Sequence, residues 1–376
     1  MSLYQELGVR RVINASATLT RLGGSLMPPP VLAAMQEAAG WFIDLPELQR
    51  RVGARIAELT HNDACYVSSG AAAGITLAVA ACLTGDDPRL IDAMPYLEEA
   101  PQTEVVVFRG QRNGYDYAAR QTGARLIEIG PDAAELSDAL NARTACVLYF
   151  AGAHFAAGAL PLEAVVPLAH ARGVPVLVDA AAQIPPISNL WRFTRELGAD
   201  AAIFSGGKGL RGPQSSGLVL GRREIVEGCR RNGPPNHSIG RPMKVGKEEL
   251  AGLLAAVEWS LAQDEAAVIA GYERSVARWV EGLAGIPGVT AARGFPSEAG
   301  QPHARAIVRL SPPCRLGRDD VVAALWERDP RVAVGTTGED AIALNPQTLA
   351  PGEDELVLAA LRAVLTGGSA AVNAAE

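Results

Sequence analysis

Short apolar runs alternate with helical patterns over residues 65–221 of the chain. The runs are apolar at successive positions, so each predicted strand is buried on both faces. Strands of this kind joined by helices predict a mainly parallel sheet with helices on both sides. The predicted strands are CYV (65–67), EVVVF (104–108), RLIEI (125–129), ACVLYF (145–150), PVLVD (175–179) and AAIFS (201–205). The predicted helices between them cover 72–83, 115–122, 135–141, 162–171 and 191–197.

The rest of the chain separates into further parts. A long helical pattern follows the parallel region, and GIPGV then interrupts it. The last segment alternates strand and helix patterns, which predict a small α+β domain. We therefore expect the α/β class, with a large, mainly parallel sheet domain and a small C-terminal α+β domain. The predicted parts are an N-terminal arm (1–25), the large domain (26–246), a connecting helix (247–283), the small domain (284–368) and a tail (369–376).

Length and charge narrow the functional classes. The 376 residues are enough for two domains, and the net charge of −7 is spread along the chain. No broad basic face is indicated, so nucleic acid is not an expected partner. The longest apolar stretch, near 71–83, is shorter than the roughly 20 residues that span a bilayer, and the N-terminus lacks the pattern of a signal peptide. We expect a cytoplasmic protein with no membrane contact.

The cysteines and histidines form no recognisable ligand pattern. The five cysteines are far apart and odd in number, which indicates a reducing compartment without structural disulfides. The five histidines include no paired motif such as H-E-x-x-H. We expect no metal site.

Small residues follow the first predicted strand, in the segment SSGAAAG (68–74) before an apolar helix. Such a turn leaves main-chain N–H groups uncovered, and the helix dipole adds positive potential, so the turn suits a phosphate. The serine hydroxyls supply further donors. The alternative is that Ser68 or Ser69 only caps an alanine-rich helix.

Asp179 ends the apolar strand PVLVD and is followed by three alanines. A carboxylate in such a place is costly unless it has a cationic or N–H partner. Capping of a helix is the alternative use of the side chain. The alanines, Ala181 among them, leave room for a flat ring against the backbone, which favours a binding role.

Lys208 stands among glycines in FSGGKGLRGPQSSG (204–217). These glycines contain the literal pattern G-x-G-x-x-G, but Pro213 follows, and SSGLVLG predicts a strand where a dinucleotide site needs a helix. A Walker loop would need Ser or Thr at Gly209. The lysine is therefore either an exposed turn residue or a nucleophile, and its small neighbours suggest room around the amine.

The three strand ends together indicate one ligand. In an open parallel sheet, ligands bind outside the carboxyl ends of the strands. Pyridoxal 5′-phosphate (PLP) needs an anion cup for its phosphate, a carboxylate for its pyridine nitrogen and an amine for its aldehyde. Ser205, which lies shortly before the lysine, is placed for a further phosphate contact. The sequence therefore predicts a PLP site.

The chain resembles the selenocysteine synthase-like branch of fold type I PLP-dependent enzymes. This branch includes bacterial L-seryl-tRNA(Sec) selenium transferase and D-glucosaminate-6-phosphate ammonia-lyase. The resemblance implies the fold type I, PLP-dependent transferase-like fold and covers most of the chain. It rests on RRVINASATLTRLGGSLMPPPVLAAM, VSSGAAAG, VPVLVDAAAQIPP, FSGGKGLRGPQSSGLVLGR, GRPMKVGKEE and ALNPQTLAPGEDELV.

The resemblance also implies roles for individual residues. Lys208 would be the catalytic lysine that binds the PLP aldehyde, and Asp179 would pair with the pyridine nitrogen. Gln111, in RGQRNGYD, falls where relatives place a residue over the ring, commonly histidine. Gln183 lies near the position that contacts the ring hydroxyl in some relatives. The implied phosphate contacts are Ser69, Gly70, Ala71 and Ser205.

Residues outside these segments are candidates for substrate binding. Thr20 and Arg21 lie in the predicted arm, and Arg211 and Arg241 lie in loops that flank the lysine segment. Residues of this kind are more often ordinary solvated surface residues. Fold type I sites are generally completed by a neighbouring subunit, so the resemblance implies a homo-oligomer of at least two chains.

The expected chemistry begins at the substrate Cα. The PLP ring withdraws electrons from Cα, and Lys208, displaced by a small-molecule amino substrate, is placed to remove the proton. The resemblance favours a lyase that acts by β-elimination with ammonia release on an amino acid or amino sugar acid. Racemisation or epimerisation is the main alternative, and transamination is a further one. The short segment before Ile13 argues against tRNA-dependent selenium transfer, and a regulatory PLP-binding module is the non-enzyme alternative.

Overall fold

The computed structural model describes residues 2–367 and divides the chain into two compact units. The large unit comprises Ser25–Gln263 with Ala299–Gln301. The small unit comprises the described residues up to Gly24, Asp264–Glu298 and those from Pro302 onward. The tail expected at 369–376 lies outside the described residues.

The large unit is built on a seven-stranded sheet with the order β2-β8-β7-β6-β5-β3-β4. Neighbouring strands are parallel except at β8, which is antiparallel to both β2 and β7. Each strand predicted from the apolar runs is present, and SSGLVLG contributes β8, so the expected α/β class is confirmed. The strands are β2 Ala64–Ser68, β3 Glu104–Phe108, β4 Arg125–Ile129, β5 Thr144–Phe150, β6 Val176–Asp179, β7 Ala201–Ser205 and β8 Gly217–Gly221.

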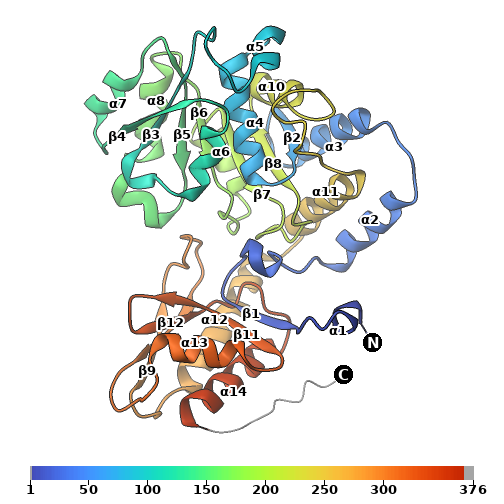
Figure 1. The fold of residues 1–376 in the computed structure, drawn as a ribbon. Coiled ribbons are helices and arrows are strands. Elements are labelled where there is room, and N and C mark those ends of the chain that lie inside the picture. Colours follow the sequence, from blue (N-terminus) through green and yellow to red (C-terminus); the bar gives the residue numbers. More distant parts are fainter. Residues whose placement is uncertain (1, 368–376) are drawn as a thin grey trace. The chain divides into compact units, whose positions relative to one another are not determined.

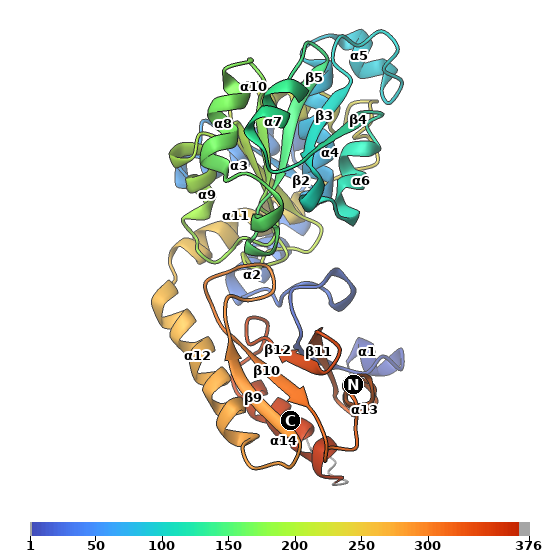
Figure 2. The same cartoon turned by 90° about the vertical axis from the view of Figure 1, so that its left-hand side faces the viewer.

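Helices cover both faces of this sheet (Figures 1 and 2). Tyr66 and Val107 pack with α4, α6 and α10 on one face, whereas Cys65 and Phe108 pack with α3, α7, α8 and α11 on the other. Successive strand residues point to opposite faces, so the continuous apolar runs fill both layers. The helices are α2 Pro29–Ala39, α3 Leu45–Leu59, α4 Ala71–Thr84, α5 Pro88–Ala93, α6 Tyr117–Arg120, α7 Ala133–Ala139, α8 Leu162–His170, α9 Asn189–Trp191, α10 Arg223–Asn232 and α11 Lys247–Leu261.

Three helical segments differ from the prediction. Most of the helix expected at 191–197 is a π-helical turn, Arg192–Glu196, which follows α9. The residues expected as one helix at 115–122 form a 3-10 turn, Gly114–Asp116, and then α6. The range expected as one connecting helix holds α11 and, in the small unit, α12 (Glu265–Gly282). Asp264 begins α12 because its carboxylate accepts a hydrogen bond from Ala267 N at 3.0 Å. A capping residue inside the apolar pattern thus separates the two helices.

The topology brings the chemically interesting strand ends to one edge of the sheet. Two successive antiparallel pairings make β2 run in the same direction as β7, so their carboxyl ends lie at the same edge. Asp179, the last residue of β6, is in register with Phe150 of β5 and Ile203 of β7. Ser68 of β2 and Ser205 of β7 both pair with Gly217 of β8. The turn after β2, Asp179 and the segment that contains Lys208 therefore lie at strand ends on the same edge of the sheet.

The small unit has a five-stranded sheet with the order β1-β11-β12-β10-β9. β1, from the predicted arm, pairs parallel with β11, and Trp279 of α12 lies in the core beneath the sheet. In the part of the chain that the structure describes, no helix has both the length and the apolar character needed to cross a membrane. The elements are α1 Leu3–Glu6, β1 Val12–Ala15, β9 Val289–Gly294, β10 Arg305–Leu310, α13 Arg318–Trp326, β11 Arg331–Thr337, β12 Ala341–Leu344 and α14 Glu353–Thr366.

Candidate active site

Asp179 presents a buried carboxyl group at the end of β6, with 8% of the residue exposed. The main-chain N–H of Ala181 donates to its Oδ1 at 2.9 Å. Burial raises the pKa of Asp179, while the Ala181 hydrogen bond and the Lys208 ammonium act in the opposite direction. The ionised form therefore gains from any further cationic N–H group that enters the site.

Lys208 lies in the turn between β7 and β8, within electrostatic reach of Asp179. Its Nζ is 6.0 Å from the centre of the Tyr115 ring. Ser25 Oγ lies 2.8 Å from the main-chain oxygen of Lys208 and 3.0 Å from that of Gly207, and its one hydroxyl proton is shared between them. These bonds hold the backbone of the turn and so position the lysine amine.

The glycines beside Lys208 serve close packing. A Cβ on Gly209 would lie 2.1 Å from the main-chain oxygen of Ile184. A Cβ on Gly207 would lie 2.5 Å from Cα of Gln214. The space beside the Cα atoms of these glycines is therefore filled by neighbouring residues. The small size of the glycines lets the turn pack tightly at the strand end.

The turn after β2 forms an uncapped helix N-terminus. Gly70 has φ +132°, which favours glycine, and Ser68 Oγ donates to its carbonyl oxygen at 2.9 Å. No side chain among residues 2–367 caps α4, so its first main-chain N–H groups, beginning at Ala71, have no acceptor within the helix. Half-buried Ser69 precedes this turn. The donors fit a phosphate.

Ser205 lies beside this turn because of the sheet register. It ends β7 and pairs with Gly217, the same residue that pairs with Ser68 on the other side of β8. A Cβ on Gly217 would come within 2.7 Å of the carbonyl carbon of Gly70, so β8 packs closely under the turn. The main-chain N–H of Ser205 also donates to Ala181 O at 3.4 Å, which links β7 to the segment after Asp179.

Gln111, expected over a cofactor ring, forms hydrogen bonds with the main chain at the end of β5. The residue is 1% exposed, and its Nε2 donates to Phe150 O at 3.0 Å. Its Oε1 accepts from Phe150 N, also at 3.0 Å. Both ends of the amide are therefore used by the main chain at the end of β5. The side chain joins the turn after β3 to β5.

Gln183 likewise holds loops together. Its Nε2 donates to Ala151 O at 3.2 Å and to Ala299 O at 2.8 Å. An amide nitrogen has two protons, so both are used by these carbonyl groups. The amide nitrogen of Gln183, which the resemblance places near a ring hydroxyl, thus bonds to two carbonyl groups of the large unit.

The four expected substrate residues are divided between the two units, with Arg211 and Arg241 in the large unit. Arg211 Nε donates to Leu26 O at 2.9 Å, and its guanidinium lies 5.4 Å from the centre of the Trp259 ring, so it is anchored within the large unit. Arg241 is exposed in the segment after α10. Thr20 and Arg21 belong to the small unit and are described with it.

The structure adds residues that the sequence analysis missed. Tyr115 is the aromatic side chain that approaches Lys208 Nζ, although the sequence directed attention to Gln111 in the same motif. Ser25 positions the lysine turn from a distant part of the chain. The tyrosine in RGQRNGYD was visible in the sequence as a signal for Tyr115. No local signal in the sequence indicated the role of Ser25.

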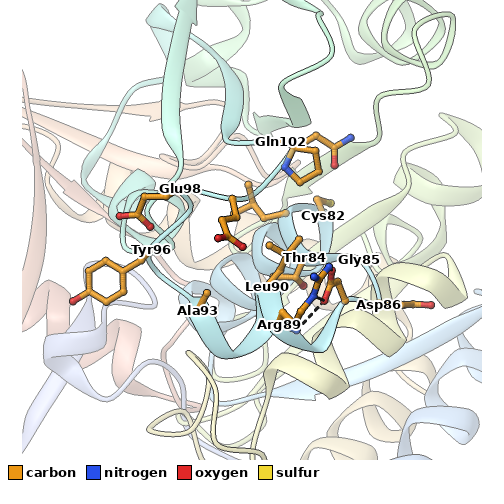
Figure 3. A pocket seen from close by; sticks show the side chains of 14 residues that line it. Cys82, Thr84, Gly85, Asp86, Arg89, Leu90, Ala93, Tyr96, Glu98 and Gln102 are labelled. Carbon is orange, nitrogen blue, oxygen red and sulfur yellow. Dashed lines mark hydrogen bonds and ion pairs between the residues drawn. The ribbon is translucent and has the colours of Figure 1, made fainter.

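A cavity of about 840 Å³ lies away from this cluster (Figure 3). It is lined by the end of α4, by α5 and by the segment before β3, including Asp86 and Glu98, and Asp87 pairs with Arg89 there. These segments adjoin the amino ends of the strands, whereas ligands of such sheets bind at the carboxyl ends. Among residues 2–367, no group of His, Cys, Asp or Glu is arranged to hold a metal ion.

The cluster at the carboxyl ends fits PLP. The buried carboxyl of Asp179 suits a protonated pyridine nitrogen, the turn at Ser69 and Gly70 suits a phosphate, and the amine of Lys208 suits an aldehyde. When bound, PLP supplies a ring that stabilises negative charge at the substrate Cα. The fold and this site together define a fold type I PLP-dependent enzyme.

Comparison with known proteins agrees with this class. The family model described as Aminotransferase class-V matches residues 113–237. D-glucosaminate-6-phosphate ammonia lyase of Salmonella typhimurium is 33% identical over 96% of this chain and 98% of its own length. The 5′-C-glycyluridine monooxygenase-decarboxylase of a Streptomyces species is 33% identical over 96% of this chain and 92% of its own. L-seryl-tRNA(Sec) selenium transferase of Desulfomicrobium baculatum is 26% identical over 95% of this chain and 83% of its own length.

Comparison with solved structures indicates the same class of enzyme. A structure of D-glucosaminate-6-phosphate ammonia-lyase matches with a TM-score of 0.85 and 31% identity, over 98% of this chain and 100% of that chain. The chain belongs to the selenocysteine synthase-like branch of fold type I PLP-dependent enzymes.

Proposed function

We propose that this protein is a PLP-dependent lyase that deprotonates Cα of an amino acid or amino sugar acid and releases ammonia after β-elimination. The observation that carries the proposal is the placement of Lys208 near the buried carboxyl of Asp179, in a chain that aligns with an ammonia-lyase along nearly the whole of both. D-glucosaminate 6-phosphate, named for that relative, is the first substrate to test.

Lys208 and Asp179 act on different protons in the proposed reaction. The amine of Lys208, positioned by the Ser25 bonds to its turn, accepts the Cα proton of the substrate. The Asp179 carboxylate keeps a proton on the pyridine nitrogen. The substituent at Cβ leaves with its bonding electrons, and water converts the resulting enamine to a keto acid and ammonia.

The remaining cofactor contacts belong to the same proposal. Ser69, Gly70 and Ala71 hold the phosphate through main-chain N–H groups and a hydroxyl, and the register that places Ser205 beside Ser68 supports Ser205 as a further contact. Ala181 offers a small surface next to Asp179. For the substrate, Arg241 is retained as a binding residue, and Thr20 and Arg21 are retained from the small unit.

The test is product analysis with the holoprotein. We expect ammonia and a keto acid in equal amounts from D-glucosaminate 6-phosphate, without oxygen uptake. Exchange of the Cα proton for deuterium without ammonia would instead identify a racemase or epimerase. Transfer of the amino group to an added keto acid would identify an aminotransferase. Either result would overturn the lyase proposal.

A second reaction is supported by one specific observation. The glycyluridine monooxygenase-decarboxylase is as similar in sequence as the ammonia-lyase, so the scaffold alone does not select between the two reactions. An amino acid substrate in that reaction would consume oxygen and release carbon dioxide. Oxygen electrode and carbon dioxide measurements on the same incubations therefore separate this reaction from β-elimination.

A homo-oligomer of at least two chains forms part of the proposal. Trp41 and Phe42, in the segment between α2 and α3, are 68% and 104% exposed, and Ile43 beside them is also exposed. Adjacent apolar side chains of this size support a surface that a second chain covers. Light scattering after gel filtration tests the oligomeric state: a monomeric wild type would contradict the proposal.

A cytoplasmic location is also part of the proposal, and it is supported by five free cysteines.

A further inference from the structure

Three residues of the connection between β9 and β10 belong to the large unit. The residues on either side, Glu298 and Pro302, are part of the small unit, whereas Ala299–Gln301 are part of the large one. No other described residue after Gln263 belongs to the large unit. The segment Ala299–Gln301, called the inserted tripeptide below, lies in no helix or strand. Its place in the large unit is therefore set by individual contacts.

The inserted tripeptide packs closely against the segment after β5. Gly300 has φ +83°, in the left-handed region that favours glycine, and a Cβ there would lie 2.5 Å from Ala153 N. The next residue, Gln301, is only 2% exposed. A backbone without room for a side chain at its centre, followed by a buried amide, is held in one place.

Two side-chain amides join the inserted tripeptide to the segment that follows Asp179. Nε2 of Gln301 donates to Ala182 O at 2.8 Å, and these residues are 119 positions apart. In the other direction, Nε2 of Gln183 donates to Ala299 O, also at 2.8 Å. Each segment thus donates one bond and accepts one, so each fixes the other.

The segment held in this way carries the N–H group that orients the Asp179 carboxylate. Ala181 N donates to Asp179 Oδ1 at 2.9 Å. Ala181 is directly followed by Ala182, whose carbonyl group accepts the bond from Gln301. Because the two alanines share a planar peptide unit, a shift of Ala182 also moves Ala181 and its N–H group.

We propose that Gln301 is a positioning residue for the cofactor, acting through Ala182 and Ala181 on the carboxylate of Asp179. That carboxylate suits the protonated pyridine nitrogen of PLP, and a hydrogen bond between charged groups weakens when its geometry is lost. This role requires Asp179 as the partner of the pyridine nitrogen, as in the proposed function, but it requires no particular reaction at the substrate Cα.

The variant Gln301→Met removes the donor to Ala182 O and keeps a side chain of similar volume. We expect the apoprotein of this variant to bind PLP at least about fivefold more weakly than the wild type in an absorbance titration. Asn141→Leu is the matched control, since Nδ2 of Asn141 donates to Glu104 Oε2 at 3.1 Å, at the amino end of β3. This control should lose stability and keep its PLP affinity.

A double-mutant cycle with Asp179→Asn separates positioning from a general effect on the fold. If Gln301 acts through the Asp179 carboxylate, Gln301→Met should change PLP affinity by less than about twofold once that carboxylate is gone. An equal loss of affinity in both backgrounds would overturn the proposal. Wild-type PLP affinity in the single variant Gln301→Met would overturn it as well.

Hydrogen exchange of the unmodified apoprotein keeps the test decisive if Gln301→Met does not fold. The peptide that contains residues 180–183 should exchange as slowly as β6 before any cofactor binds, because the inserted tripeptide already holds it. Rapid exchange of this peptide would show that the segment is not held, and the proposal would fail.

These measurements do not depend on the lyase assay. Non-additive PLP affinities in a protein that releases no ammonia would refute the proposed reaction and leave the role of Gln301 in place. Additive affinities combined with normal ammonia release would refute the role of Gln301 and leave the reaction in place.

Discussion

Asp179 and Ala181 are linked by a 2.9 Å hydrogen bond from the main-chain N–H of Ala181 to the Asp179 carboxylate. The bond partly compensates for burial of the acid, yet the pKa of Asp179 is still raised. The protein thus holds a carboxyl group whose charged form is costly until a cation arrives. The protonated pyridine nitrogen of PLP is such a partner, and this links the stability of the site to its occupancy.

The variant Asp179→Asn should separate the cost of the buried carboxylate from its role as partner of the cofactor. Because the folded pKa of Asp179 is raised, the stability that it contributes to the cofactor-free protein is complete below the unfolded pKa of about 3.9 and is lost as the pH rises through the folded value. Without PLP, the Asn variant should therefore unfold at a higher temperature than the wild type at pH 7. The difference should shrink as the pH falls toward about 4.

The same variant should lose activity. Asparagine cannot hold the proton on the pyridine nitrogen as a carboxylate does, so turnover should fall by about 100-fold or more. Thermal unfolding with and without PLP, at neutral and acidic pH, measures the first effect, and steady-state kinetics measures the second. A variant that is less stable than the wild type without cofactor, or that keeps full activity, would contradict the role given to Asp179.

Gln111→Ala should destabilise the fold without removing the cofactor. The substitution leaves Phe150 N–H and C=O unpaired in a buried place, and each unsatisfied group costs about 1–3 kcal/mol. Denaturant unfolding should show a loss of about 2 kcal/mol or more, while the folded variant keeps its PLP absorbance. Normal stability combined with lost PLP would restore Gln111 to the cofactor ring.

Tyr115→Ala should weaken PLP binding and leave the stability of the fold nearly unchanged. The side chain is 64% exposed, so its removal costs little stability, but its ring lies 6.0 Å from Nζ of Lys208, the proposed cofactor-binding residue. Loss of an aromatic contact worth about 0.5–1.5 kcal/mol should weaken PLP binding from about twofold to about tenfold. Tyr115→Phe is the matched control and should retain affinity. Equal PLP affinity in the Ala variant and the wild type would exclude the contact.

Gly209→Ala should displace the lysine turn. The new Cβ would lie 2.1 Å from Ile184 O, so the backbone next to Lys208 must shift, and a misplacement of about 1 Å can cost about 100-fold in rate. Gly271→Ala in α12 is the control, since its Cβ would meet only Arg274 Nη2 at 3.6 Å and should stabilise the helix. Wild-type kcat in the Gly209 variant would show that the turn has room after all.

The order of strands and helices could be predicted because its signals are local. Strands such as 104–108 are apolar at every position after the first, and α4 or α8 carry helical spacing within one segment. The residue types at the strand ends also sufficed to predict PLP, since Asp179 and Lys208 follow strands whose ends must coincide in a parallel sheet.

Contacts between distant segments were not predictable in this way. Gln111 and Phe150 are 39 residues apart, and nothing in either segment shows that a side-chain amide pairs with a strand backbone. The glycines around Lys208 suggested open space, whereas Ile184, from the segment after β6, lies directly beside Gly209. Pairing of β1 with β11 similarly joins the two ends of the chain, and no local pattern encodes it.

The central claim is that Lys208 holds the cofactor aldehyde. Borohydride reduction of the holoprotein, followed by peptide mass spectrometry, tests it directly, because the lysines of this chain are Lys208, Lys244 and Lys247 alone. We predict that the pyridoxyl group is recovered on the peptide that contains Lys208, and that Lys208→Ala abolishes the label. Labelling of Lys244 or Lys247 in place of Lys208 would contradict the account.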